Sequence, residues 1–275
     1  MDEIILCQLV ELACAFNKIS IKPVICGGLG IYLYFYNRQS ELPLRTTNDI
    51  DLILTKTHVL EQFRCEAIAE LITGELGYKV CEGGKHFQFE KANQQKLYIL
   101  AQPIEGINVE GFRVKFVKSH LHGYLTPEAC FIEEDLRTIF LPDILPDNEK
   151  AKGLEVFVPS PTNFLLLKLF AFDDRDEKKE NDTAQTHAFD VYVIITLADR
   201  NDYLQGQKFL ARHKSSEIIQ RAESIVTNKF SSVEQPGWLY VLKTSNFYPN
   251  LNVQQKRERL DEAKRRLVRW FTVSP

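Results

Sequence analysis

Two apolar segments joined through a glycine pair constrain the fold of this chain most strongly. The segment "KPVICGG" (22–28) is a short apolar run closed by two glycines, and "LGIYLYFYNR" (29–38) follows it with helical character. The segment "DIDLILT" (49–55) alternates at first and is then fully apolar, which is typical of a strand inside a sheet. A buried strand, a helix and a second buried strand together predict a sheet covered by helices.

The rest of the chain divides into two parts of different character. Residues 3–18 and 59–77 predict amphipathic helices, the second with Gly77 as its C-cap. Further strands are expected over 78–84, 85–91 and 95–102, with a hairpin over 107–117. Beyond a charged, exposed connector at 173–185, helical patterns continue to 271. We therefore expect an α+β fold: a domain with an α/β-type mixed sheet in residues 1–157, then a helical domain in residues 158–275.

Composition narrows the class of protein. A net charge of −3 over 275 residues excludes a nucleic-acid footprint that covers the whole molecule. The N-terminus "MDEIIL" lacks the basic region of a signal peptide, and no apolar run approaches the eighteen or so residues that span a bilayer. The six cysteines are scattered without C-x-x-C pairs or zinc spacing, so we expect most of them to act as small core residues. These features predict a soluble, cytoplasmic protein without a membrane partner.

Asp49 and Asp51 are candidate metal ligands. Residues i and i+2 of a strand point to the same side, and two adjacent carboxylates repel unless a cation such as Mg²⁺ neutralises them. Gly27 and Gly28, at a strand-to-helix turn, allow a phosphate to approach the N–H groups of a helix N-terminus. Taken alone, the aspartate pair could be a solvated strand start and the glycine pair a simple turn. Together and in this order, they predict a metal site and a phosphate-binding turn of the kind that nucleotidyl transfer needs.

These residues also carry a family resemblance. The stretch "VICGGLGIYLYFY", followed by "RTTNDIDLIL", resembles the signature of the DNA polymerase β-like nucleotidyltransferase superfamily. Its AbiEii/AbiGii-type toxin branch is the most similar, because "R-x-T-x-DID" resembles the approach to that branch's metal acids. The later segments "VPSPTNFLLLKLFAFDDR" and "HAFDVYVI" resemble the second domain of the branch.

The resemblance implies roles at the matching positions. Asp49 and Asp51 would hold Mg²⁺, with a two-ion site expected, and an NTP would be the substrate. The residues expected to bind the nucleotide are Gly27, Gly28, Thr47, Lys168 and Asp190. For the last two, the residues themselves leave other interpretations open: a lysine whose stem lies along the surface, and a solvated helix position.

The chain departs from the family's pattern at two places, one of which is Thr186 and His187, where family members often carry a Lys-Asp pair. A third carboxylate is expected on a later strand, near Tyr98 in "QKLYILAQ", and tyrosine cannot bridge a cation at neutral pH. Glu90, in the strand segment "HFQFEK", is the candidate replacement and is included among the predicted catalytic residues. Alternation places His86, Gln88 and Glu90 on one face, opposite Phe87 and Phe89. Whether that face meets a metal or water is left open by the sequence.

The segment "KRERLDEAKRRLVRW" (256–270) predicts a basic C-terminal helix. Leu260, Leu267 and Phe271 form one stripe that we expect to dock on the domain. The outward basic face either contacts RNA phosphates or is a solvated face with internal salt bridges.

The leading functional hypothesis is Mg²⁺-dependent transfer of NMP from an NTP to an acceptor hydroxyl, with tRNA or another RNA as the expected acceptor. The resemblance implies a toxin or phage-defence component with a cognate antitoxin protein as partner. Two alternatives stay open: a catalytically silent nucleotide-binding or interaction module of the same fold, and a small-molecule transferase of the antibiotic-modifying kind.

Overall fold

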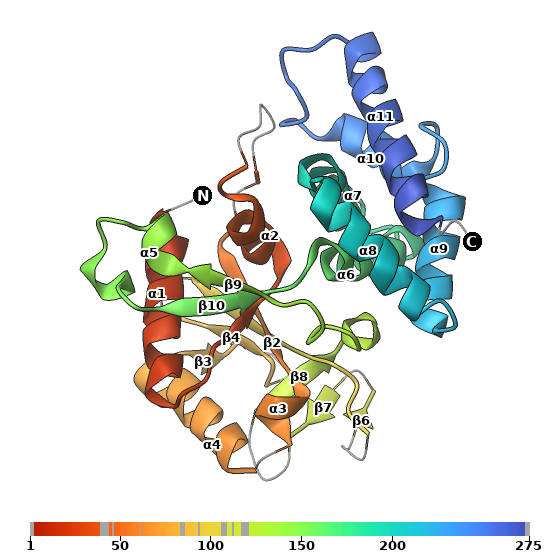
Figure 1. Cartoon of the computed structure of the whole chain (residues 1–275). Coiled ribbons are helices and arrows are strands. Elements are labelled where there is room, and N and C mark those ends of the chain that lie inside the picture. Colours follow the sequence, from red (N-terminus) through yellow and green to blue (C-terminus); the bar gives the residue numbers. More distant parts are fainter. Residues whose placement is uncertain are drawn as a thin grey trace. The chain divides into compact units, whose positions relative to one another are not determined.

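The computed structural model describes residues 3–38, 44–45, 47–60, 62–82, 86–92, 94–105, 109–111, 113–116 and 121–272. The chain forms two compact units, and Figure 1 labels most of their helices and strands. The first unit comprises Met1–Asn37 and Arg45–Pro159, and the second comprises Arg38–Leu44 and Ser160–Pro275. The second unit thus begins at Ser160, whereas we expected a boundary at 158, and it also takes in a segment from the first part of the sequence.

The first unit contains a ten-stranded mixed sheet. Its strands are β1 (Val24–Ile25), β2 (Asp49–Leu54), β3 (Lys79–Val80), β4 (Gln88–Glu90), β5 (Lys96–Ala101), β6 (Val109–Glu110), β7 (Arg113–Lys115), β8 (His122–Leu125), β9 (Arg137–Phe140) and β10 (Glu155–Val158). The path through the sheet is β6-β7-β8-β5-β2-β1-β10-β9, and β4 joins it at β5 and carries β3. β2 runs parallel to β5 and antiparallel to β1. The expected α+β class with a mixed sheet is confirmed.

Five α-helices accompany the sheet in the described part of this unit: α1 (Glu3–Lys18), α2 (Gly27–Phe35), α3 (Lys56–Val59), α4 (Gln62–Glu70) and α5 (Leu141–Ile144). A π-helical turn follows α4 at Leu71–Glu75, and short 3₁₀ turns lie at Pro127–Ala129 and Glu149–Ala151. The helix expected over 59–77 is present from Gln62 to Glu75, as α4 and the π-helical turn, whereas Val59 belongs to the separate helix α3. Gly77 follows the π-helical turn with a φ of +68°, the left-handed conformation expected of the residue that ends a helix.

The central strand β5 organises the sheet around the predicted site. β2 pairs with all six residues of β5 along one edge. The other edge is divided, with β4 opposite Lys96–Tyr98 and β8 opposite Leu100–Ala101. Alternation then gives β2 and β5 one apolar face, whose buried residues are Ile50, Leu52, Leu54, Leu97, Ile99 and Ala101. The half-buried polar residues Asp49, Asp51 and Tyr98 lie on the opposite face.

The described part of the second unit is helical. It contains α6 (Pro161–Glu177), α7 (Asn181–Leu197), α8 (Arg200–Arg212), α9 (Glu217–Lys229), α10 (Pro236–Lys243) and α11 (Val253–Phe271). The Ser-Pro start of α6 acts as expected, since Ser160 Oγ accepts a hydrogen bond from the Asn163 N–H at 3.4 Å. Aromatic side chains form much of the core, including the fully buried Trp238, Trp270, Tyr192 and Phe247.

The expected connector at 173–185 was wrong. α6 continues to Glu177 and α7 begins at Asn181, so most of this charged segment is helical. Asp173 is buried, because Lys229 Nζ lies 2.9 Å from its carboxylate and Arg221 lies 3.2 Å away. A hydropathy pattern alone predicts that a charged side chain such as Asp173 is exposed. An ion-paired charge can be buried, because its partner compensates for the lost contact with water.

Arg38 belongs to the second unit although it follows α2 in the sequence. Its guanidinium donates to the Leu197 carbonyl at 2.9 Å and forms ion pairs with Asp199 and Asp202 at the start of α8. Asp202 is itself buried and completes a capping box with Asp199. The second unit is therefore completed by an arginine about 160 positions away in sequence.

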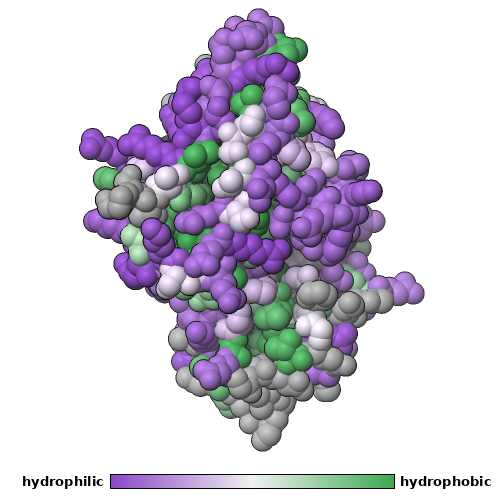
Figure 2. Space-filling model, turned by 90° about the vertical axis from the view of Figure 1, so that its right-hand side faces the viewer, coloured by the Kyte–Doolittle hydropathy of each residue, from purple (hydrophilic) through white to green (hydrophobic). Residues whose placement is uncertain are grey.

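None of the helices in the described part of the chain combines the length and the apolar character needed to cross a bilayer. Hydrophilic residues cover most of the face drawn in Figure 2, with small hydrophobic clusters between them. All six cysteines are free thiols. Cys26 and Cys65 are buried as expected, but Cys7 is exposed and the other three are half-buried.

His58 is buried at the start of α3, with only 8% of its surface exposed. Its Nδ1 accepts a hydrogen bond from the Thr55 N–H at 3.3 Å, which requires the neutral imidazole. Burial lowers the pKa of His58 to about 4, against the opposing charge of Glu133. As the pH falls, His58 therefore binds a proton near pH 6.5 in the unfolded chain but only near pH 4 in the folded protein.

We expect the free energy of unfolding to fall as the pH drops from 6.5 towards 4, by about 2 kcal/mol between pH 7.5 and pH 5. Urea denaturation at these two pH values measures the loss. His58→Gln keeps an acceptor at the third helical position and should remove most of the dependence, whereas His213→Gln should keep it. An unchanged pH dependence in His58→Gln would rule out His58 as its source.

Candidate functional site

The glycine turn after β1 is anchored directly against the aspartate strand. β1 and β2 are antiparallel, and the Cys26 N–H continues the ladder by donating to the Asp51 carbonyl at 2.8 Å. Gly27 then takes a φ of +61°, the left-handed conformation that glycine adopts without strain. This turn starts α2 within one residue of the ladder, so the helix begins beside Asp51.

Both glycines make room for side chains of the chain itself. A Cβ on Gly27 would overlap the Asp51 carboxylate. A Cβ on Gly28 would lie 2.6 Å from Arg45 Nη2 and 2.7 Å from Arg45 Cζ. The carboxylate of Asp51 and the guanidinium of Arg45 therefore lie over the first turn of α2, where we expected a nucleotide phosphate to approach.

Asp49 and Asp51 lie on one face of β2, as the D-x-D spacing predicts, and both are half-buried. The Thr47 hydroxyl donates a hydrogen bond to Asp49 Oδ1, and Thr47 itself is only 7% exposed. Thr47 thus lies beside the predicted metal ligands and orients one of them.

Tyr98 occupies the position next to this pair. In the parallel ladder between β2 and β5, Asp51 is in register with Tyr98 and Asp49 with Lys96. Burial, followed by the negative charges of Asp49 and Asp51, raises the pKa of Tyr98. The side chain beside the two carboxylates is therefore a neutral phenol at neutral pH.

Glu90 shares the face of the two aspartates but is not brought next to them. It is in register with Lys96, which is in register with Asp49, so Lys96 separates the two acids. Two strand spacings correspond to about 10 Å. The Glu90 carboxylate interacts with the Cys81 thiol, and burial and this carboxylate raise the pKa of Cys81.

The donor set at Asp49 and Asp51 fits Mg²⁺. Carboxylate oxygens are hard donors, and Mg²⁺ is commonly held by one or two carboxylates together with waters and substrate phosphates. Among the residues that the structure describes, no group of three or more His, Cys, Asp or Glu side chains is arranged to hold a metal. The sheet pairing brings Asp49 and Asp51 together but not Glu90, and a metal ion at the two aspartates stays a prediction.

Lys168 and Asp190 form a buried ion pair inside the helical unit. Lys168 Nζ on α6 lies 2.8 Å from Asp190 Oδ2 on α7, and the side chains are 7% and 2% exposed. Neither the surface-lying lysine nor the solvated aspartate is found, so both alternative interpretations were wrong. The pair satisfies two buried charges, and a contact of Lys168 with nucleotide phosphates stays a prediction.

The C-terminal helix α11 docks as expected. Leu260 and Leu267 are 0% exposed and Phe271 is 4% exposed, which confirms the predicted stripe. Many basic side chains have partners on the same unit: Lys264 and Arg265 with Asp261, Arg266 with Glu262, Arg257 with Glu234, and Arg259 and Arg269 over the rings of Tyr248 and Tyr203. This pairing matches the interpretation of a solvated face with internal salt bridges, and an RNA contact stays a prediction.

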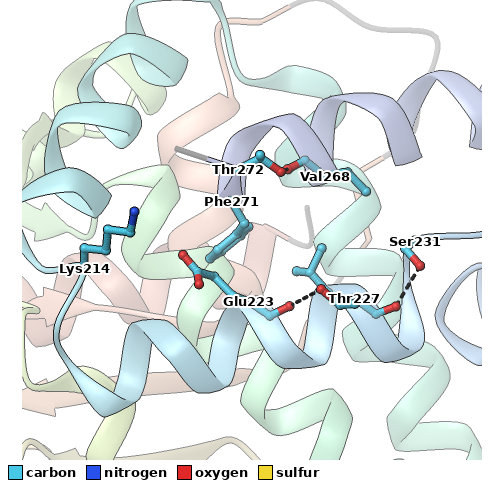
Figure 3. Close-up of a pocket in the computed structure, with 8 residues that line it drawn as sticks. Lys214, Glu223, Thr227, Ser231, Val268, Phe271 and Thr272 are labelled. Atoms are coloured by element: carbon cyan, nitrogen blue, oxygen red, sulfur yellow. Dashed lines mark hydrogen bonds between the residues drawn. The ribbon is translucent and has the colours of Figure 1, made fainter. Parts of the chain in front are cut away.

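A pocket of about 280 Å³ lies between α9 and α11 (Figure 3). Its lining combines Lys214, Glu223 and Phe271 with three hydroxyl side chains. The Thr227 and Ser231 hydroxyls donate to the backbone carbonyls of Glu223 and Thr227. None of the predicted site residues lines this pocket, so it is a separate feature of the helical unit.

Sequence reasoning missed one residue of the site. Arg45 is part of the quoted "R-x-T-x-DID" segment, yet no role was predicted for it. The sequence feature that could have indicated a role is its position four residues before Asp49 and six before Asp51. Only the fold shows that its guanidinium lies over Gly28.

Comparison with known proteins adds no assignment to this geometry, since the chain matches no protein-family model and no curated protein.

Proposed function

We propose that this chain is a Mg²⁺-dependent nucleotidyltransferase that transfers NMP from an NTP to an acceptor hydroxyl. The observation that supports this most directly is the placement of Asp49 and Asp51 on one face of β2, with the Asp51 carboxylate over Gly27 at the start of α2. Paired carboxylates beside a helix N-terminus suit a substrate that is both metal-bound and polyanionic.

In the proposed reaction the acceptor hydroxyl gives its proton to solvent water, its oxygen forms a bond to the α-phosphorus, and the bond from this phosphorus to pyrophosphate breaks. Bound Mg²⁺ would polarise the acceptor hydroxyl and neutralise charge on the leaving pyrophosphate. Asp49 and Asp51 would hold the metal, with Asp49 oriented by the Thr47 hydroxyl. The N–H groups of the first turn of α2 would attract the phosphates.

The acceptor that we propose is an RNA end, with tRNA as the first candidate, and we propose a toxin role with an antitoxin partner. Both extensions rest on the resemblance of "VICGGLG" and "RTTNDIDLIL" to the AbiEii/AbiGii-type branch. The basic helix α11 is the candidate RNA contact, although ion pairs within the unit already engage several of its cations.

A catalytically silent nucleotide-binding module is the second candidate. The specific observation in its favour is Tyr98, which stands in register with Asp51 where a third carboxylate is expected. A two-carboxylate site still binds a metal–nucleotide complex, because the phosphates supply the remaining ligands.

Incubation with each α-labelled NTP, Mg²⁺ and either total tRNA or a panel of hydroxyl-bearing small molecules tests the proposal. We expect label on RNA, lost when the metal is chelated. Label on a small molecule alone would point to the antibiotic-modifying alternative. NTP binding without any labelled acceptor would favour the silent module, and Tyr98→Asp should then restore labelling by supplying a carboxylate beside Asp51.

A further inference from the structure

The guanidinium of Arg45 lies on the first turn of α2, against Gly28. The arginine side chain is half-buried, and the Asp51 carboxylate covers the neighbouring Gly27. Both charged groups therefore lie side by side on the same helix turn, at the end of the nine-residue helix α2 whose backbone N–H groups are unpaired within the helix.

The helix end, Arg45, Asp49 and Asp51 together carry a net charge of about −0.5 at this turn. The N-terminus of a helix carries roughly half a positive charge. Arg45 adds one positive charge, and Asp49 and Asp51 together supply two negative charges at pH 7. A divalent cation on the two aspartates would consume their negative charge and leave Arg45 and the helix end uncompensated. The metal-loaded site therefore requires an anion at Arg45.

We propose that Arg45 is a phosphate-binding residue of this site, and that Gly28 lacks a side chain so that the guanidinium can occupy this position. The inference rests on the proposed function and adds a residue to it. The ligand class is the polyphosphate of a metal-bound nucleotide, because a guanidinium binds two phosphate oxygens with parallel hydrogen bonds. Asp51 would serve the metal, and the guanidinium on the neighbouring glycine would bind the phosphates.

Alanine substitutions at Gly27 and Gly28 are expected to differ in how much they disturb the fold. Gly28→Ala places a methyl group against the far end of a flexible side chain, which moves at little cost, and alanine suits a helix better than glycine. Gly27→Ala is strained by the φ of +61° and overlaps Asp51. Gly28→Ala is therefore the variant that displaces the guanidinium while the fold is kept, and Gly74→Ala, with nothing closer than 4.0 Å, is its matched control.

Equilibrium binding to the full-length protein tests the proposal, with Mg²⁺–tripolyphosphate and Mg²⁺–ATP as the probes and Mn²⁺ alone as a third ligand. We expect Arg45→Ala and Gly28→Ala to weaken binding of both polyphosphates by about tenfold to a hundredfold. Arg45→Lys should recover only part of this loss, because an ammonium cannot form the paired hydrogen bonds. Mn²⁺ alone should bind Arg45→Ala at least as tightly as the unmodified protein, because a competing cation is gone. Arg200→Ala, on the surface of α8, and Gly74→Ala should change none of these values.

Polyphosphate binding is measured independently of NMP transfer, so the role of Arg45 and the proposed function can fail separately. Loss of polyphosphate binding in Arg45→Ala supports the role of Arg45 even if no acceptor is ever labelled. Unchanged polyphosphate affinity in both Arg45→Ala and Gly28→Ala would overturn the role of Arg45, even in a protein that transfers NMP. A parallel loss of Mn²⁺ binding in Arg45→Ala would also overturn it, since the arginine would then serve only to shape the aspartate pair.

Discussion

Asp49→Asn and Asp51→Asn are each expected to reduce NMP transfer by about a thousandfold or more. The two carboxylates lie on one face of β2 and are the predicted metal ligands. Asparagine has nearly the same shape, so it removes the charge that holds the metal while the packing at Gly27 is kept. Initial rates of labelled-NTP transfer, with Mn²⁺ affinity measured in parallel, check both effects.

Two further substitutions sharpen this first prediction. Asp147→Asn alters an exposed aspartate of the same unit and should leave rate and metal affinity unchanged. Glu90→Gln should also keep most of the activity, because Lys96 stands between Glu90 and Asp49 in the ladder. A thousandfold loss in Glu90→Gln would instead identify Glu90 as the third metal ligand. Full activity in both Asp49→Asn and Asp51→Asn would exclude the site proposed for catalysis.

Lys168→Met is expected to lower the free energy of unfolding by about 3–5 kcal/mol, the cost of leaving one member of a buried ion pair alone. Lys168 Nζ lies 2.8 Å from Asp190 Oδ2, and both side chains are almost fully buried. Without the lysine, the Asp190 charge stays buried and uncompensated. Urea denaturation followed by circular dichroism measures the change.

The double variant Lys168→Met/Asp190→Leu separates structure from function at this pair. Replacing both charges with apolar groups of similar size is often neutral or stabilising, so we expect most of the lost stability to return. If the double variant also recovers NMP transfer, the pair is structural and the phosphate contact predicted for Lys168 is wrong. If stability returns while polyphosphate affinity stays reduced, Lys168 reaches the nucleotide. No loss of stability in Lys168→Met would contradict the buried pair itself.

Helix and strand positions followed closely from local patterns in several places. The predicted helix at 3–18 coincides with α1, and the one predicted at 256–270 lies within α11, because each carries a regular apolar stripe. The strand at 49–55 also appears, as β2. The pattern was misleading where charges are paired, as at Asp173, and at the start of the second helix, where Val59 ends the separate helix α3.

In the candidate site, too, some features follow from the local sequence and others only from the fold. The D-x-D spacing alone placed Asp49 and Asp51 on one face, because side chains alternate along a strand. The strand pairing that sets Tyr98 beside Asp51 and Lys96 beside Asp49 joins residues more than forty positions apart. Local sequence carries no information on such a register, since it is chosen by the packing of the whole sheet.

By itself, the sequence determined the mixed α+β class, the carboxylate pair on β2 and the glycine turn that precedes α2. Only the tertiary structure decided that the Arg45 guanidinium lies on Gly28, that Lys168 is buried against Asp190, and that Tyr98 fills the place beside Asp51. The physical reason is the range of the interactions. Alternation and helical periodicity act between near neighbours in the chain, whereas burial and ion pairing are settled by which distant segments the fold brings together.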